Sequence, residues 1–184
     1  MMFDGAAAAT AGLDHAASLH RPEVVVVDPS IPDAATLVAG LKPGTEVITL
    51  DPGRDGVRQL AERLGGRKDL GAIHILSHGE EGEVRLGTGL LEDASIGGYR
   101  DALKAIGQSL APGGDILFYG CFVGRGQEGE TFLRDLAKAT GADIAASRDI
   151  TGSPTAGFNW SLEARTGSIE ADIRDVMTDT ALSG

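Results

Sequence analysis

The sequence predicts a single α/β domain, a three-layer α/β/α sandwich built on a mostly parallel sheet of about six strands. Three observations lead to this prediction. The chain of 184 residues has the size of one ordinary domain. Short apolar runs typical of buried strands alternate with amphipathic segments of helical period, and such alternation forms parallel sheets covered on both faces. No internal repeat or linker divides the chain.

Five segments have the pattern of buried parallel strands. The first contains four consecutive valines that Asp28-Pro29 stops, which indicates a strand buried on both faces. An alternating segment at 157–164 predicts a final strand, at an edge of the sheet. The five buried strands are predicted over 23–32, 45–52, 71–79, 114–121 and 141–147.

The segments between these strands predict the helices and one smaller element. Residues 82–92 alternate and turn at a Gly-Thr-Gly sequence, which predicts a small hairpin after the third strand. We expect a flexible leader over 1–20, the folded domain over 21–173 and a loose, polar tail over 174–184. The helices are predicted over 33–41, 55–66, 94–110 and 128–140.

The composition excludes several classes of function. Lys and Arg number 16 against 27 Asp and Glu, giving a net charge of −11, so nucleic acid and anionic membranes are not expected as partners. The apolar runs fall short of the roughly 20 residues of a membrane span, so none is expected. The single cysteine excludes an internal disulfide and CxxC motifs. No classical signal peptide is visible at the start of the sequence.

Two predicted strands end in residues that can carry chemistry. His78 ends the third strand and Cys121 ends the fourth. Because the carboxyl ends of parallel strands form the sites of open α/β sheets, these side chains can meet in one crevice as base and nucleophile. The backbone N–H groups of Gly79 and Cys121 would then be donors to an oxyanion. The alternative is that Cys121 is a small buried side chain at a strand end.

The chain order of this pair narrows the class of enzyme. The cysteine lacks the flanking glycines of a nucleophile elbow, and no histidine follows it. A histidine first and a cysteine later, each at a strand end, is the order of caspases. The stretches "IHILSHGEEGEVRLG" and "DILFYGCFVGRGQEGETFLRDLAKATGADIAAS" resemble the caspase-like superfamily of cysteine peptidases, over roughly residues 1–173. The "QACRG" signature of caspases is absent, so specificity for aspartate is not expected.

The chain is similar, more closely, to an N-terminal domain of giant secreted bacterial adhesins with cadherin-like or calcium-binding repeats. The resemblance implies His78 as base, Cys121 as nucleophile, and Gly79 with Cys121 as the oxyanion hole. It implies a secreted or cell-surface protein that cleaves a peptide or protein. Those adhesins carry "LEPR" ahead of a segment like "MMFDGAA", which implies cleavage of the protein's own precursor after a basic residue. The alternative is a non-catalytic retention or interaction module of a surface protein.

The resemblance also suggests residues for substrate specificity. Relatives that cleave after Arg or Lys hold the basic side chain with an acidic residue. Asp28 ends the run of valines in the first predicted strand, and Asp149 follows the fifth strand. The alternatives are that Asp28 caps the loop before the next helix and that Asp149 is a solvated loop residue. The carboxylates near His78, at 80–83, lack the spacing of a calcium loop, so no metal is predicted. No cofactor is predicted either, and we expect His74 to be a buried structural residue.

Overall fold

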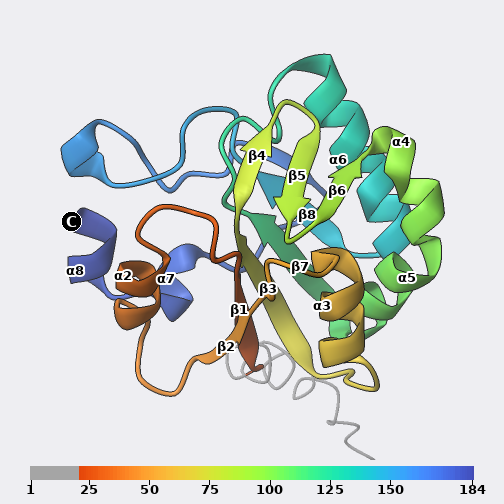
Figure 1. Cartoon of the computed structure of the whole chain (residues 1–184), viewed down its shortest axis with the longest axis horizontal. Coiled ribbons are helices and arrows are strands. Elements are labelled where there is room, and N and C mark those ends of the chain that lie inside the picture. Colours follow the sequence, from red (N-terminus) through yellow and green to blue (C-terminus); the bar gives the residue numbers. More distant parts are fainter. Residues whose placement is uncertain (1–20) are drawn as a thin grey trace, which may run out of the picture.

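The computed structural model describes residues 21–184, and the leader predicted over 1–20 lies outside the described residues. A six-stranded sheet crosses the domain in the order β2-β1-β3-β7-β8-β9 (Figure 1). All neighbours are parallel except β9, which pairs with β8 in the antiparallel sense. The strands are β1 Glu23–Val27, β2 Glu46–Thr49, β3 Leu70–Leu76, β7 Leu110–Phe118, β8 Asp143–Ala146 and β9 Ala164–Thr166.

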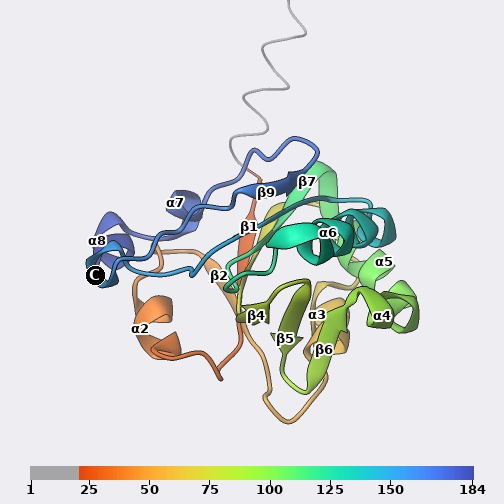
Figure 2. The ribbon, with the colours of Figure 1, turned by 90° about the horizontal axis from the view of Figure 1, so that it is seen from above.

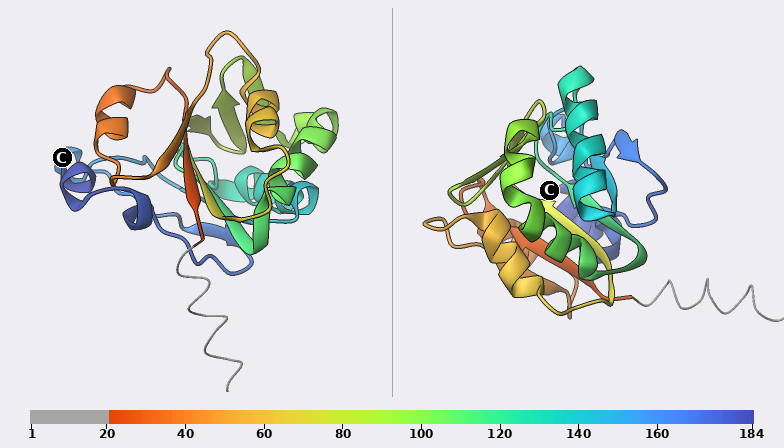
Figure 3. Two further views of the ribbon diagram at one scale, coloured as in Figure 1. Left: turned by 90° about the horizontal axis from the view of Figure 1, so that it is seen from below. Right: turned by 90° about the vertical axis from the view of Figure 1, so that its right-hand side faces the viewer.

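Helices cover both faces of the sheet, which confirms the predicted three-layer sandwich (Figure 2). One face carries three short helices, and the other carries one short helix and three longer ones, seen from their side in Figure 3. The short helices are α2 Ala34–Ala39, α7 Ile173–Val176 and α8 Asp179–Ser183. The opposite layer contains α3 Gly56–Leu64, α4 Asp93–Ile96, α5 Arg100–Gln108 and α6 Gly126–Thr140. Within residues 21–184 no helix has the length and apolar character needed to cross a membrane.

The four valines of β1 show why the sheet is buried on both faces. Side chains of a strand alternate between the two faces of its sheet. Val24 and Val26 pack into the core under α3, α5 and α6, whereas Val25 and Val27 pack into the core of the opposite face. All four are buried, as an unbroken valine run predicts for a central parallel strand.

The element after β3 is larger than the predicted hairpin. The hairpin itself forms from β5 Glu83–Leu86 and β6 Gly89–Glu92, joined at the expected turn. A third strand, β4 His78–Glu80, pairs with β5 and makes a three-stranded antiparallel sheet. His78 therefore begins a strand of its own, directly after Ser77, instead of only ending the third strand.

The C-terminal part of the chain corrects two predictions. The segment 157–164 is a loop for most of its length, and the edge strand β9 begins only at its last residue, Ala164. The tail predicted to be loose instead contains α7 and α8. Val176 and Met177 are buried in the core of that face, in one cluster with Val25 and Val27 of β1. The folded domain therefore continues past residue 173.

Candidate active site

The ends of β3 and β7 bring the two candidate catalytic residues to one edge of the sheet. The strands are parallel neighbours, and Ile75 of β3 is paired with Phe118 of β7. The N–H of Tyr119 continues this pairing by donating to the carbonyl of Ile75 over 2.9 Å. His78 and Cys121 each lie three residues beyond the Ile75–Phe118 pair, so the two chains leave the sheet side by side.

Two glycines allow these chain ends to approach closely. A Cβ atom on Gly120 would lie 3.2 Å from both Cα and N of Gly79. A Cβ atom on Gly79 would lie 3.1 Å from the carbonyl oxygen of Cys121 and only 2.3 Å from a methyl group of Val123. Side chains at either position would therefore push the histidine and cysteine segments apart. The close approach of Gly79 to Gly120–Cys121 is the main geometric feature of the site.

A main-chain carbonyl anchors the imidazole of His78. Its Nε2 lies 3.2 Å from the carbonyl oxygen of Ser30, in the loop after β1. A carbonyl oxygen only accepts, so Nε2 carries a proton, and whenever the ring is neutral its lone pair lies on Nδ1. The exposed ring is thereby fixed in the tautomer in which Nδ1 can accept a proton. His78 and the thiol of Cys121 are not hydrogen bonded to one another.

Asp28 shapes the loop that holds His78. Its buried carboxylate accepts hydrogen bonds from the hydroxyl and N–H of Ser30, at 2.6 and 2.9 Å, and from the N–H of Gly87 at 2.6 Å. Burial alone would raise the pKa of the Asp28 carboxyl, but these hydrogen bonds, together with His78 when its ring is protonated, lower it below its usual value. With both oxygens occupied and hidden from solvent, Asp28 has no free face for a substrate. The prediction that it binds a basic side chain is corrected to the alternative, a cap of the loop.

The turn after Cys121 is held in an unusual conformation. Phe122 has φ of 63°, the left-handed region that bulky residues rarely adopt. Its N–H donates to the carbonyl of Asp149, and its carbonyl accepts from the N–H of Arg125, both over 2.9 Å. A strained residue directly after a nucleophile candidate is typical of functional turns. The turn lifts Cys121 out of the line of β7 and leads into α6.

Asp149 lies in the loop that borders this turn. Its carboxylate accepts from the hydroxyl of Ser147 at 3.0 Å and from the side-chain amide of Asn159 at 2.9 Å. The residue is exposed overall, so unlike Asp28 it keeps access to solvent. Of the two predicted specificity residues, only Asp149 is exposed, and its carbonyl accepts the N–H of Phe122, the residue after Cys121.

The predicted oxyanion donors lie next to one another. Gly79 faces Gly120, the residue before Cys121, as the contacts above show. Among the described residues no acceptor takes a hydrogen bond from the N–H of Cys121. A free N–H beside a half-buried thiol is the arrangement that an oxyanion hole needs.

His74, the other histidine of β3, takes no part in this edge of the sheet. It is completely buried, its Nε2 lies 2.6 Å from a carboxylate oxygen of Glu23, and its ring stacks on Tyr119 with the ring centres 6.0 Å apart. These contacts fit the expectation of a structural histidine. Glu80, Glu81 and Glu83 belong to no group of three or more metal-ligating side chains, and no such group occurs anywhere within residues 21–184.

Sequence reasoning missed Ser30, Gly87 and Phe122. The Asp-Pro-Ser sequence after β1 is a signal for an Asx turn, in which the aspartate accepts from the N–H two residues on, and it identifies Ser30 as its partner. Gly87 is 59 residues away from Asp28, and only the folded chain brings them together. Phe122 has no local signal, because an aromatic residue disfavours a left-handed conformation.

Comparison with known proteins assigns the chain to a family. One family profile, described as a domain of unknown function (DUF4347), matches residues 24–182. The match includes both ends of the sheet, the candidate site and the C-terminal helices. No curated protein matches the sequence.

Proposed function

We propose that this chain, which belongs to the DUF4347 family, is a cysteine endopeptidase with Cys121 as nucleophile and His78 as general base. One observation carries the proposal: the backbone of Gly79 meets that of Gly120–Cys121, while Ser30 holds the His78 ring in the tautomer of a base. Nucleophile and base at adjacent strand ends, with the base oriented by a third group, form the usual arrangement of covalent catalysis.

The reaction uses these groups in two steps. Nδ1 of His78 takes the proton of the Cys121 thiol, and the sulfur attacks the carbonyl carbon of the scissile peptide bond. The N–H groups of Gly79 and Cys121 hold the oxyanion. The carbon–nitrogen bond then breaks, and His78 returns the proton to the leaving amine. In the second step His78 takes a proton from water, whose oxygen attacks the thioester carbon. The carbon–sulfur bond breaks, the acid product leaves, and His78 returns the proton to the sulfur of Cys121.

A polypeptide substrate is supported by the surface beside the turn. Ile150 and Phe158 are the large apolar side chains that stay exposed within residues 21–184, at 38% and 39%. Both lie in the loop after β8 whose Asp149 carbonyl binds the N–H of Phe122. An apolar surface on the loop that holds the turn after Cys121 suits the side chains of a peptide. Asp149 supplies the negative charge for a basic residue at the cleavage position.

The natural substrate in this proposal is the protein's own precursor or a neighbouring chain at the cell surface. The resemblance to adhesin domains supports a secreted or surface location within a larger bacterial protein. The test is to express the chain with LEPR placed ahead of Met1 and to sequence the N-terminus of the product. Wild type is expected to be trimmed after the arginine, and Cys121→Ala to stay intact. Equal trimming of both chains would reject self-processing.

A second candidate, a non-catalytic retention or interaction module, is favoured by one observation. The His78 ring and the Cys121 thiol are not hydrogen bonded, and the ring is exposed. In a peptidase this contact would form when the substrate binds, because catalytic hydrogen bonds in many enzymes tighten only in the substrate complex. A panel of fluorogenic peptides with Arg, Lys, Asp or Ala before the bond separates them. The peptidase cleaves the Arg and Lys peptides and loses this activity in Cys121→Ala, whereas the module cleaves none.

A further inference from the structure

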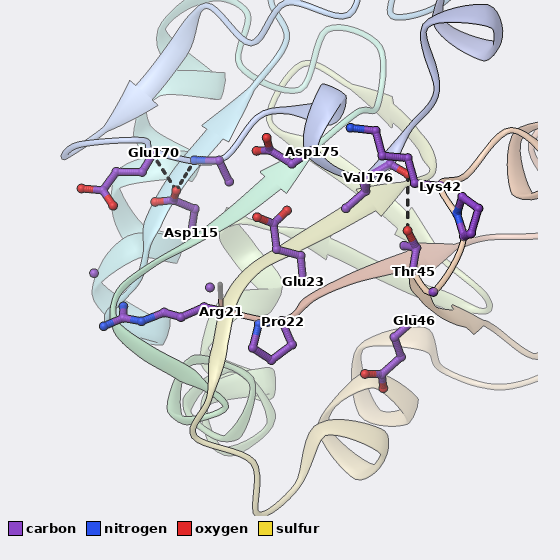
Figure 4. A pocket seen from close by; sticks show the side chains of 15 residues that line it. Arg21, Pro22, Glu23, Lys42, Thr45, Glu46, Asp115, Glu170, Asp175 and Val176 are labelled. Atoms are coloured by element: carbon purple, nitrogen blue, oxygen red, sulfur yellow. Dashed lines mark hydrogen bonds between the residues drawn. The ribbon is translucent and has the colours of Figure 1, made fainter. Parts of the chain in front are cut away.

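A cavity of about 770 Å³ opens at the amino ends of the strands, on the edge of the sheet opposite His78 and Cys121 (Figure 4). Glu23 begins β1 and Glu46 begins β2, and both line it. The segment around residues 170–176 closes one side, and Lys42 to Glu46 close another. Its volume is that of a small-molecule site, for which about 300–1,000 Å³ is usual.

Asp115 gives this cavity an unsatisfied polar group. Its side chain is buried, with 1% of the residue exposed, and lies on the cavity wall. Oδ2 accepts hydrogen bonds from the N–H groups of Glu170 and Ala171, each over 2.9 Å (Figure 4). Oδ1 is buried and has no partner among the described residues. Burying a carboxylate oxygen without a hydrogen-bond donor costs free energy. Oδ1 is therefore a candidate acceptor for a hydrogen bond from a ligand.

The charges around Asp115 are predominantly negative. Five carboxylates line the cavity, against two cationic side chains, Arg21 and Lys42. Both cations are engaged by main-chain oxygens: Arg21 donates to the carbonyl of Pro112, and Lys42 to that of Arg174. The five carboxylates are those of Glu23, Glu46, Asp115, Glu170 and Asp175.

Two of these carboxylates lack a cationic partner. Glu46 forms an ion pair with Arg67, and Glu23 is bound by the imidazole of His74. Within residues 21–184, neither Asp115 nor Asp175 forms an ion pair. Burial, with the negative charges of Asp143 and Glu170 nearby, raises the pKa of the Asp115 carboxyl. A cation placed in the cavity would relieve both the unpaired oxygen and this repulsion.

The volume of the cavity and the arrangement of its carboxylates indicate which kind of cation fits. No three metal-ligating side chains converge in the described part of the chain, and the cavity is far larger than a single ion needs. An elongated molecule with several ammonium groups can reach Asp115 on one wall and Asp175 and Glu23 elsewhere. The first twenty residues contain no lysine or arginine, so they supply no such group.

We propose that this cavity binds a linear polyamine, with one ammonium group donating to Oδ1 of Asp115 and the others lying against Glu23 and Asp175. The site is separate from the candidate active site and does not depend on the proposed peptidase activity. Charge-assisted hydrogen bonds to a buried carboxylate provide the affinity, and the volume of the cavity favours a chain over a single ion.

The test measures spermidine binding to the whole chain by isothermal titration calorimetry at physiological ionic strength. Asp115→Asn preserves the acceptor for the N–H groups of Glu170 and Ala171, so this variant is expected to fold, which its thermal unfolding verifies. The matched control is Asp101→Asn, which removes one exposed charge from α5, a helix of the layer on the other face of the sheet. We expect the Kd for spermidine to rise at least about tenfold in Asp115→Asn, about 1.4 kcal/mol, and to stay within about twofold in Asp101→Asn.

Three outcomes would overturn the proposal. Spermidine could fail to bind at millimolar concentration, or it could bind Asp115→Asn as tightly as wild type, as nonspecific attraction to an acidic protein would predict. Calcium could bind more tightly than spermidine and displace it, which would make the cavity a metal site.

Discussion

The carbonyl oxygen of Ser30 lies 3.2 Å from Nε2 of His78, although the two residues are 48 positions apart in the chain. The loop after β1 thus orients the imidazole of His78, which lies just beyond the end of β3 at the edge of the sheet. Asp28 fixes that loop through both the hydroxyl and the N–H of Ser30. The base of the candidate site is therefore positioned by a neighbouring strand, and its orientation depends on a buried carboxylate.

Asp28→Asn is expected to lower the free energy of unfolding by about 1–3 kcal/mol at neutral pH, because the amide would place a donor against the N–H of Gly87 or Ser30. The folded pKa of Asp28 is lowered, so its stabilising contribution is complete above about pH 4 and is lost as the pH falls through the folded pKa. Urea unfolding of both proteins between pH 3 and 7 should therefore show the gap closing toward low pH. A gap that is constant over this range would contradict the assigned role.

Gly79→Ala tests the close approach of the two chain ends. The added methyl group would overlap Val123, so we expect a loss of about 1–3 kcal/mol in unfolding free energy. Val123→Ala removes the methyl group that Gly79→Ala meets, and the double variant should recover part of the loss in a double-mutant cycle. Strictly additive losses would mean that these residues are not in contact.

Phe122 provides a test of backbone strain beside the nucleophile candidate. Phe122→Gly and Phe122→Ala both remove the ring, which also lies against the guanidinium of Arg125. Only glycine adopts the φ of 63° without strain, so the glycine variant should be more stable than the alanine variant by about 1 kcal/mol. Equal thermal stabilities would show that the turn carries no such strain.

Ile150 and Phe158 test the peptide-binding surface. Both side chains are exposed, so Ile150→Ser and Phe158→Ser should leave the melting temperature nearly unchanged. If these residues bind the substrate peptide, each change should raise KM severalfold with little effect on kcat, because the contacts are the same in the ground state and the transition state. Unchanged KM in both variants would remove this loop from the substrate site.

Much of the fold is predictable because local patterns determine it. The valine run of β1 is buried on both faces, and the segments that hold His78 and Cys121 end neighbouring parallel strands, as the order of strands and helices indicates. The C-terminal region was harder to predict. The alternating segment at 157–164 looks like a strand, yet Phe158 is exposed, and β9 forms where β8 offers a partner.

The candidate site is predictable only in part, because some of its contacts join residues that only the folded chain brings together. His78 and Cys121 have a sequence signal because reactive side chains next to glycines follow apolar strands. Asp28 also follows an apolar strand, although no glycine lies beside it, and it has a different role, because its carboxylate binds Gly87, a residue of the β5–β6 turn that only tertiary structure brings near. Ile173 and Val176 are spaced as on one face of a helix, but the polar residues around them suggest a loop. Their burial becomes apparent only in the core of that face of the folded sheet.

The central claim is that His78 activates Cys121, and thiol labelling as a function of pH tests it most directly. An unpaired cysteine, with a pKa of about 8.5, reacts slowly with iodoacetamide below neutral pH because little thiolate is present. Cys121 is the single cysteine, so mass spectrometry follows its modification alone. We predict rapid labelling of wild type at pH 6–7 and labelling at least about tenfold slower in His78→Ala. Identical profiles that both follow an ordinary thiol titration would contradict the account and leave Cys121 as a structural residue.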